Sequence, residues 1–327
     1  MRVLVTGSNG FLGSWLSRAL ALRGDEVRCL ARAKSDVGLL EAALEGGAQL
    51  VHGDVSQPET LGALLDGVEV VFHLAGIRRA ATRAEFMRIN AEGTRNVAEA
   101  MVKAGARRLV LCGSLAASGP SVGGRPRVEA DPFCPEEWYG ESKAEAERVA
   151  FEYANALEVT ACRPGRILGP GDKENLTFFK LVKRGVVVRI LGPERRLSVV
   201  GVEDAVDLLL LQGDRPEAKG EAFFCASDET TSLYAMMRTI ADSLGIDARE
   251  VPVPEALLSA AGAVGDWVSK LTGRRLPVSR KLARQLLAPG WTCSIEKAKR
   301  LLGYAPSRTV RQALEQSAQS YFEAGWL

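Results

Sequence analysis

The chain has 327 residues, with 42 Lys and Arg against 40 Asp and Glu and a formal net charge of +2. This length predicts one large domain or two interleaved domains with a sizeable core. The near balance of charge argues against the positive field that drives nonspecific nucleic-acid binding, so we expect no nucleic-acid partner.

The six cysteines and two histidines have no spacing typical of a metal site. No Cys-x-x-Cys occurs, and His52 and His73 each close an expected strand away from other ligand residues. We expect reduced, buried cysteines and no metal. The sequence opens directly on a strand pattern, and its longest apolar stretch, 254–268, contains Glu255 and Asp266. We therefore expect a soluble, cytoplasmic protein.

Short β-branched segments alternate with helical segments in the first half of the chain. Strands are expected at 2–6, 26–31, 48–53, 68–75, 107–114 and 158–164. Strands this apolar, separated by helices, are typical of a parallel sheet covered on both faces, so we predict an α/β fold with a doubly wound parallel Rossmann sheet. Apolar residues at helical spacing predict one long helix over 83–105.

The regular alternation ends near residue 170. Short strands are expected at 186–191 and 197–202, followed by a helix from Glu203 and a strand at 221–227. We expect residues 1–170 to form the Rossmann domain, to which the chain returns around 197–226. Residues 171–196 and 227–327 are expected to form a smaller, interleaved C-terminal substrate-binding region.

Three glycines follow the first expected strand and open the first helix. Gly7 permits a tight turn, Gly10 lets backbone N–H groups approach a pyrophosphate at the positive helix end, and Gly13 permits close packing of helix and strand. In this strand-to-helix context the spacing predicts that residues 1–170 bind a dinucleotide.

The end of the second strand indicates which dinucleotide is bound. An acidic residue there usually holds a free ribose 2′-hydroxyl, whereas a 2′-phosphate needs a nearby arginine. Here Ala31 takes the place of the acid, and Arg32 and Lys34 follow. This favours NADP(H) over NAD(H), although both cations also fit a role as solvated surface charges.

Tyr139 and Lys143 lie four residues apart on an expected helix and therefore on one face of it. An ammonium beside a phenol favours the phenolate, which makes Tyr139 a candidate general acid and base. On its own such a pair is common on amphipathic helices, so its meaning depends on the other motifs.

Several further segments occur in a fixed order along the chain: TGSNGFLG (6–13), GDV (53–55), FHLAG (72–76), NAEGTRNV (90–97), CGSLAASG (112–119), YGESK (139–143) and RPGRILGPGD (163–172). Together they resemble the extended short-chain dehydrogenase/reductase family, over more than half of the chain. Ala75-Gly76 and Gly113-Ser114 differ from pairs common in relatives, but neither change removes a required group.

The resemblance implies a role for individual residues. Tyr139 is expected to donate or accept the proton, Lys143 to favour its phenolate and hold the nicotinamide ribose, and Ser114 to hydrogen-bond the substrate oxygen. Asp54 and Val55 are expected to flank the adenine. The expected cofactor-binding residues are Thr6, Gly7, Asn9, Gly10, Phe11, Leu12, Gly13, Arg32, Lys34, Asp54, Val55, Leu74, Ala75, Gly76, Asn90, Tyr139, Lys143, Pro164 and Gly165.

The family contains several reactions, which only the site can separate. By resemblance, nucleotide sensors lack the Tyr and Lys pair, and dehydratases need an acidic pair beside the hydroxyl, where this chain has Leu115 and Ala116. Epimerases commonly place a phosphate-binding arginine at the position of Leu197. Arg196 is one residue away and would point to the other face of a strand, unless a turn redirects it or Arg195.

The apolar C-terminal part resembles the branch that contains 3β-hydroxysteroid dehydrogenase-like and dihydroflavonol reductase-like proteins. We therefore expect an NADP(H)-preferring oxidoreductase that moves hydride between nicotinamide and a ketone or secondary alcohol of a small hydrophobic substrate, such as a sterol, steroid or β-keto lipid. A nucleotide-sugar epimerase is the alternative. In many relatives the helices around 83–104 and 137–154 pair two subunits, so the resemblance implies a homodimer.

Residues 267–295 combine leucine and tryptophan with basic residues and contain no acidic residue. Two interpretations stay open. The segment can cover the second region as ordinary amphipathic helices, or it can form a flap that contacts an anionic membrane surface and admits a lipid-soluble substrate. Its basic residues are Lys270, Arg274, Arg275, Arg280, Lys281 and Arg284.

Overall fold

The structure, a computed structural model, describes residues 1–272 and 280–327. Its central sheet has seven parallel strands in the order β10-β6-β5-β4-β1-β2-β3, which confirms the predicted doubly wound fold. The crossover direction reverses between β1 and β4, the place where such sheets bind ligands. The strands are β1 (Arg2–Thr6), β2 (Glu26–Ala31), β3 (Gln49–His52), β4 (Val70–His73), β5 (Arg108–Cys112), β6 (Glu158–Pro164) and β10 (Ala222–Cys225).

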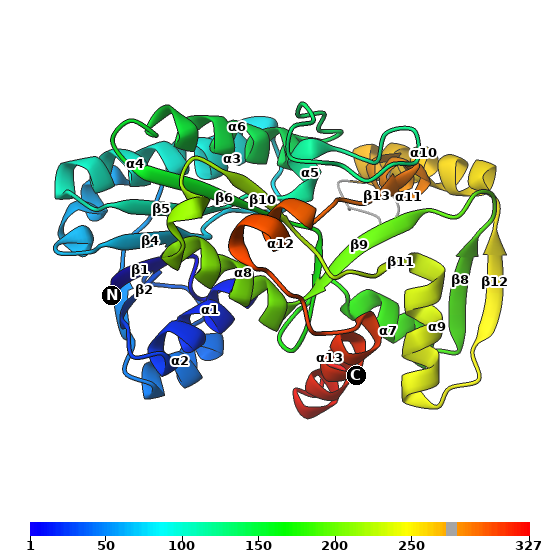
Figure 1. The fold of residues 1–327 in the computed structure, drawn as a ribbon. Helices are drawn as coiled ribbons and strands as arrows, with labels where there is room; N and C mark the ends of the chain where they lie inside the picture. The colour runs from blue at the N-terminus through cyan, green and yellow to red at the C-terminus, as the bar shows by residue number, and fades with distance from the viewer. Residues whose placement is uncertain (273–279) are drawn as a thin grey trace.

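Helices cover both faces of the central sheet (Figure 1). One face carries α4 (Gly93–Ala104) and α6 (Trp138–Glu152), and the other carries α1 (Phe11–Leu22), α2 (Glu41–Glu45) and α8 (Val202–Asp214). Each layer buries aliphatic side chains against the sheet, as Leu16 and Leu20 of α1 do. Short 3₁₀ turns occupy Gly38–Leu40, Pro58–Thr60, Gly62–Leu65 and Pro216–Ala218.

The expected single helix over 83–105 is interrupted by a π-helical turn. The turn, Met87–Glu92, separates α3 (Arg83–Phe86) from α4. It carries Asn90, whose amide donates to the carbonyl of Ile77 at 3.0 Å and to the Ser142 hydroxyl at 2.8 Å and accepts from the Ile77 N–H at 2.8 Å. These bonds to two other segments favour the wider turn, which apolar spacing alone does not reveal.

The second region has its own small sheets. In a four-stranded sheet, β9 (Arg196–Gly201) pairs with β7 (Arg166–Leu168), β11 (Thr230–Ser232) and β13 (Gly290–Trp291), while β8 (Val186–Ile190) pairs with β12 (Arg249–Val253). The chain returns to the central sheet through α8 and β10. The remaining helices are α5 (Leu115–Ser118), α7 (Leu176–Lys183), α9 (Leu233–Leu244), α10 (Glu255–Thr272), α11 (Arg280–Leu287), α12 (Glu296–Leu302) and α13 (Val310–Glu323).

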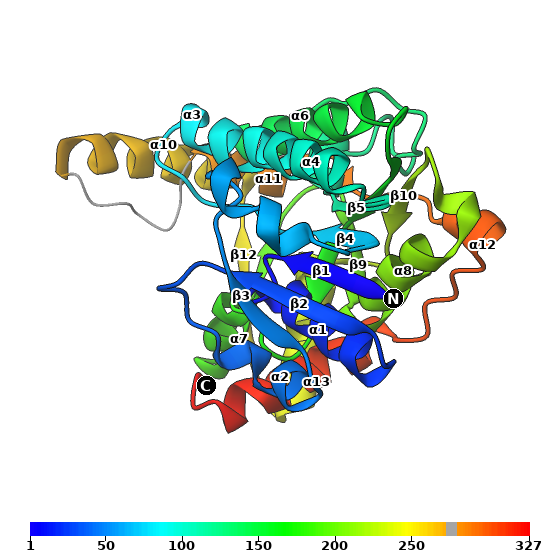
Figure 2. The ribbon, with the colours of Figure 1, turned by 90° about the vertical axis from the view of Figure 1, so that its left-hand side faces the viewer.

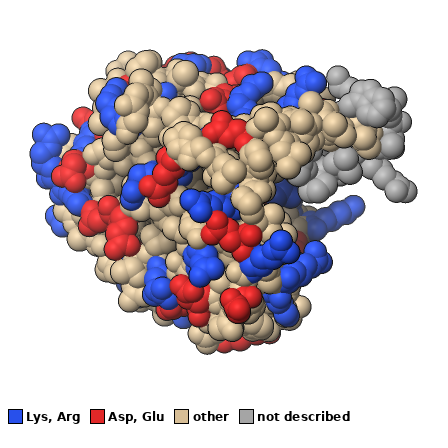
Figure 3. All heavy atoms as spheres, turned by 90° about the vertical axis from the view of Figure 1, so that its right-hand side faces the viewer, with Lys and Arg blue, Asp and Glu red and all other residues tan. Residues whose placement is uncertain are grey.

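Basic and acidic side chains are interspersed on the face that carries β8 and β12 (Figure 3). No helix within residues 1–272 or 280–327 has the length and apolarity needed to cross a membrane. The six cysteines are all free, but the expectation that all are buried is wrong for Cys134, which is exposed in a loop, and for Cys112, which is half-buried.

Helix α10 extends away from the body of the molecule (Figure 2). The basic segment 267–295 begins in its last turns and continues through α11 to β13. Arg274 and Arg275 lie outside the described residues. A bond between the Gln285 amide of α11 and the Glu137 carboxylate, at 2.5 Å, joins the segment to the start of α6.

Candidate active site

The glycine turn between β1 and α1 is packed so closely that side chains are excluded. A Cβ at Gly7, whose φ is +67°, would come within 2.6 Å of the Ala75 backbone N, and a Cβ at Gly13 within 2.2 Å of the Gly7 carbonyl O. Gly10 begins the helix without a side-chain cap, and the first turn of α1 has no acidic residue. The free N–H groups at this positive helix end fit the pyrophosphate of a dinucleotide.

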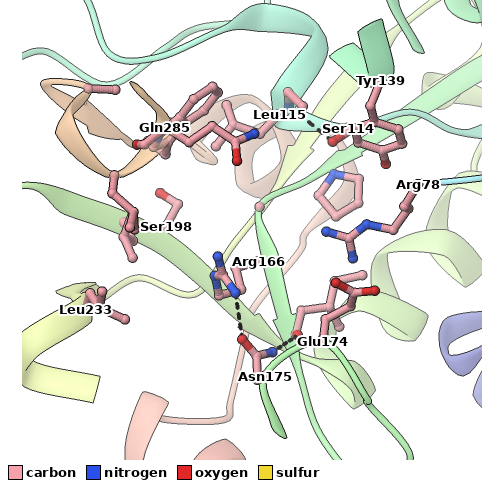
Figure 4. A pocket seen from close by; sticks show the side chains of 18 of the residues that line it. Arg78, Ser114, Leu115, Tyr139, Arg166, Glu174, Asn175, Ser198, Leu233 and Gln285 are labelled. Carbon is pink, nitrogen blue, oxygen red and sulfur yellow. Dashed lines mark hydrogen bonds between the residues drawn. The ribbon is translucent and has the colours of Figure 1, made fainter. Parts of the chain in front are cut away.

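A cavity of about 810 Å³ lies between the carboxyl ends of the central strands and the second region. It passes from the glycine turn to Ser114 and Tyr139 and on to α7, α9 and α11 (Figure 4). The structure brings these predicted site residues to its wall: Gly7, Gly10, Phe11, Leu12, Gly13, Leu74, Gly76, Ser114, Tyr139, Lys143, Pro164 and Gly165.

Ser114, Tyr139 and Lys143 meet in one part of this wall. Ser114 is the N-cap of α5, and its hydroxyl accepts from the Ala116 N–H at 3.1 Å. Tyr139 lies in the first turn of α6 beside Ser114 (Figure 4), and its ring centre lies 5.8 Å from the Arg78 guanidinium. One turn later, the buried Lys143 ammonium donates to the carbonyl of Cys112. The phenol of Tyr139, the hydroxyl of Ser114 and the ammonium of Lys143 thus line the same part of the cavity. A phenol placed there can exchange a proton with a carbonyl oxygen of a bound substrate.

The other predicted cofactor residues lie outside the cavity wall, and several of them hold the wall in place. The Asn9 amide donates to the Asp36 carbonyl at 3.0 Å, which ties the glycine turn to the segment after β2. The Asp54 carboxylate accepts from the Ser56 N–H and hydroxyl, both at 2.8 Å. Val55 is buried, Ala75 is half-buried, and Arg32 and Lys34 are exposed after β2.

A buried hydrogen-bond chain supports the ends of β1 and β4. The Ala75 N–H donates to the Thr6 hydroxyl at 3.1 Å, and Thr6 contacts His73 Nδ1 at 2.7 Å. His73 Nε2 contacts the Thr94 hydroxyl at 3.1 Å, which donates to the Asn90 carbonyl at 2.7 Å. Burial, together with the charge of Lys143, lowers the pKa of His73 to about 3, so the imidazole is neutral and bridges the two threonines.

We expect this neutral histidine to make folding pH-dependent. Below its usual pKa of about 6.5, His73 gains a proton in the unfolded chain but stays neutral in the folded chain down to about pH 3. Lowering the pH from about 6.5 to about 5 therefore costs about 2 kcal/mol of unfolding free energy. Urea titrations at the two pH values measure this cost. His73→Gln should lose most of the dependence and exposed His52→Gln should retain it; a dependence unchanged by His73→Gln would contradict the assignment.

Sequence reasoning predicted that the second region binds the substrate but did not identify the wall residues that it contributes. Apolar side chains line this part of the wall together with charged and polar ones, and α11 closes it from above, where Gln285 faces Ser114 across the cavity (Figure 4). Arg78 and Arg166 also face the space. Arg166 lies in the quoted motif 163–172 and Arg78 two residues after the motif 72–76, but no spacing rule singled them out. The apolar wall residues are Phe178, Val188, Ile190, Leu197, Leu233, Leu282, Leu286 and Trp291.

A model of the NAD dependent epimerase/dehydratase family matches residues 3–226 of the chain. The chain belongs to this family. Membership confirms the resemblance to extended short-chain dehydrogenases/reductases and makes the chain an NAD-dependent enzyme of the oxidoreductase type. The matched range ends at the last strand of the central sheet and leaves half of these apolar wall residues, Leu233, Leu282, Leu286 and Trp291, outside it.

Relatives in this family have different activities. The chain is 33% identical to the ceramide reductase of Caulobacter vibrioides, with 99% of this chain and 96% of the relative covered. It is 28% identical to the UDP-glucose 4-epimerase of Vibrio cholerae, with 98% and 96% covered. Among solved structures, that of gox2253 superposes with a TM-score of 0.84 at 28% identity and covers 99% of this chain and 98% of that chain.

Proposed function

We propose that this enzyme transfers hydride between a nicotinamide dinucleotide, with NADP(H) preferred, and a ketone or secondary alcohol of a hydrophobic substrate such as a sterol, steroid or β-keto lipid. The observation that carries the proposal is the cavity itself. A phenol and a hydroxyl stand side by side at one end of it, and apolar side chains such as Phe178, Leu233 and Trp291 line the second region's part of the wall together with charged and polar ones. Such a site suits an apolar molecule with one reactive oxygen.

Each polar group has a separate task in this proposal. The bound dinucleotide supplies or accepts the hydride. The Ser114 hydroxyl orients the substrate oxygen, and Tyr139 gives that oxygen a proton in reduction or removes it in oxidation. Lys143, held at the end of β5 by the Cys112 carbonyl, places a positive charge next to the phenol and holds the nicotinamide ribose.

The name of one relative favours a lipid substrate. Ceramide, which the Caulobacter vibrioides relative is named for, is a lipid, and that relative aligns over nearly the whole chain, including the apolar wall. A screen of long-chain ketones, steroid ketones and UDP-sugars, read as net oxidation of NADPH, tests the proposal. Oxidation with the apolar ketones supports it, and oxidation with none of them contradicts it.

The alternative, a nucleotide-sugar epimerase, rests on the Vibrio cholerae relative. Such an enzyme needs cations for the substrate diphosphate. Arg196 is held by the Thr230 hydroxyl at 2.7 Å and does not line the cavity, while Arg195 lines it but pairs with Glu255 at 2.5 Å. Both arginines are therefore engaged, so neither of the two arginines that the sequence offers for a diphosphate is available for it.

We expect Arg32→Ala to weaken NADPH binding about 10- to 100-fold while NADH binding changes little, because only NADPH brings a phosphate to the guanidinium. Within the described residues Arg32 forms no ion pair, so its charge is available after β2. Fluorescence titration of both cofactors measures the effect. Arg300→Ala, which removes an exposed arginine of α12, is the matched control. Equal weakening of both cofactors, or no weakening of either, would contradict a contact between Arg32 and the 2′-phosphate.

Two further expectations stay predictions. One is a homodimer formed through α4 and α6, and the other is contact of residues 267–295 with an anionic membrane surface. The segment covers the cavity through Leu282, Gln285 and Leu286, so a membrane contact there would lie next to the proposed substrate entrance.

A further inference from the structure

The arginines that line the cavity fall into two groups. Arg189 pairs with Glu250 at 2.9 Å, and Arg195 pairs with Glu255. Arg78 and Arg166 also line the cavity, yet no carboxylate within residues 1–272 or 280–327 lies within ion-pair distance of either. The part of the cavity near Tyr139 therefore contains two guanidinium groups without a direct counterion.

Arg166 is held in place by neutral contacts. It lies at the start of β7, where one of its N–H groups donates to the Asn175 carboxamide oxygen at 2.7 Å. Asn175 is 2% exposed and donates in turn to the Asp172 carboxylate at 2.5 Å. The guanidinium carbon lies 5.6 Å from the centre of the Phe178 ring. The planar group is thus oriented before any ligand arrives, and its remaining donors point into the cavity (Figure 4).

The surroundings of Arg166 favour an added negative charge. Its side chain is accessible to solvent because it faces the cavity, but the enclosing protein lowers the pKa of the guanidinium by desolvation, and the charge of Arg78 lowers it further. The carboxylates of Asp172 and Glu174 raise the pKa of Arg166, but neither forms an ion pair with it. Asp172 accepts from Asn175, and Glu174 pairs with Arg79 at 2.9 Å. A bound anion would offset the repulsion between the two guanidinium groups.

We propose that Arg166, assisted by Arg78, binds an anionic group of the substrate, a carboxylate or a phosphate, so that the substrate is an acidic amphiphile rather than a neutral lipid. The inference rests on the proposed function and narrows its substrate class. A planar guanidinium matches an oxyanion by paired hydrogen bonds, and Leu233 and Trp291 also line the cavity, where an apolar chain would contact them.

Calorimetric titration of the protein saturated with NADP⁺ tests this inference without turnover. The probes are octanoate, octyl phosphate and octanol, which share one chain and differ in the head group. We expect octanoate or octyl phosphate to bind about tenfold or more tightly than octanol. The tighter of the two anions identifies the head group. Arg166→Gln should remove the preference for an anion, Arg166→Lys should retain part of it, and Arg189→Gln, which removes an arginine already paired in the same cavity, should keep it.

Two results would overturn the inference. The first is equal affinity of the unmodified protein for octanoate, octyl phosphate and octanol. The second is an Arg166→Gln variant that binds NADP⁺ more weakly but still prefers the anionic probes over octanol as strongly as the unmodified protein does. Failure of the proposed function gives a different pattern, because anion-selective binding would persist while no ketone is reduced. Turnover of neutral ketones without anion selectivity would instead contradict this inference alone.

Discussion

Tyr139→Phe is expected to lower turnover by about 10²- to 10⁴-fold, the range that loss of a positioned proton donor costs. The phenylalanine ring retains the packing of Tyr139, whose ring centre lies 6.3 Å from that of Phe86, so the cavity and the cofactor site should persist. Initial rates with the substrate found in the screen measure the loss, and a dinucleotide titration checks that the site is intact.

The control for this experiment is Tyr153→Phe, which removes a phenol from the chain segment after the same helix, where its hydroxyl contacts Glu99 at 3.2 Å. We expect that variant to keep full turnover. If Tyr139→Phe were as active as the unmodified enzyme, Tyr139 would not be the proton donor and the proposed chemistry would be wrong.

Gly13→Ala is expected to have the largest effect on cofactor binding. The added Cβ would meet three backbone atoms of residues 7 and 8 within 2.9 Å, and none of them can move without displacing the glycine turn. Overpacking of this kind costs about 1–3 kcal/mol. We expect dinucleotide affinity to fall by about tenfold or more, since 1.4 kcal/mol corresponds to about a factor of ten.

Gly62→Ala is the matched control for Gly13→Ala, because a Cβ there has no atom within 4 Å. Dinucleotide titration and urea unfolding of both variants separate loss of the binding turn from general destabilisation. Unchanged cofactor affinity in a folded Gly13→Ala variant would show that the turn does not hold the dinucleotide.

Local patterns predicted the central sheet and the glycine turn because both depend on residues close in sequence. Apolar strands such as Leu109–Leu111 require burial on both faces, and glycine spacing after a strand fixes the turn before α1. The position of Tyr139 and Lys143 on one helical face follows from the same local geometry.

The features that were missed depend on contacts between distant segments. The π-helical turn follows from the bonds of Asn90 to Ile77 and Ser142, and neither partner is visible in the apolar period of the helix. Arg166 faces the cavity with its guanidinium held by Asn175, nine residues later, and no spacing in the sequence indicates that bond. In the same way, Gln285 covers the site through a bond to a residue 148 positions earlier in the chain.

Transfer of deuterium from labelled NADPH to a long-chain ketone tests the proposed function most directly. We predict an alcohol product that carries the label on its carbinol carbon, in proportion to the cofactor consumed, and no net consumption with UDP-glucose. Epimerisation of UDP-glucose without net loss of cofactor, together with no label in any ketone-derived product, would contradict the account and establish the epimerase instead.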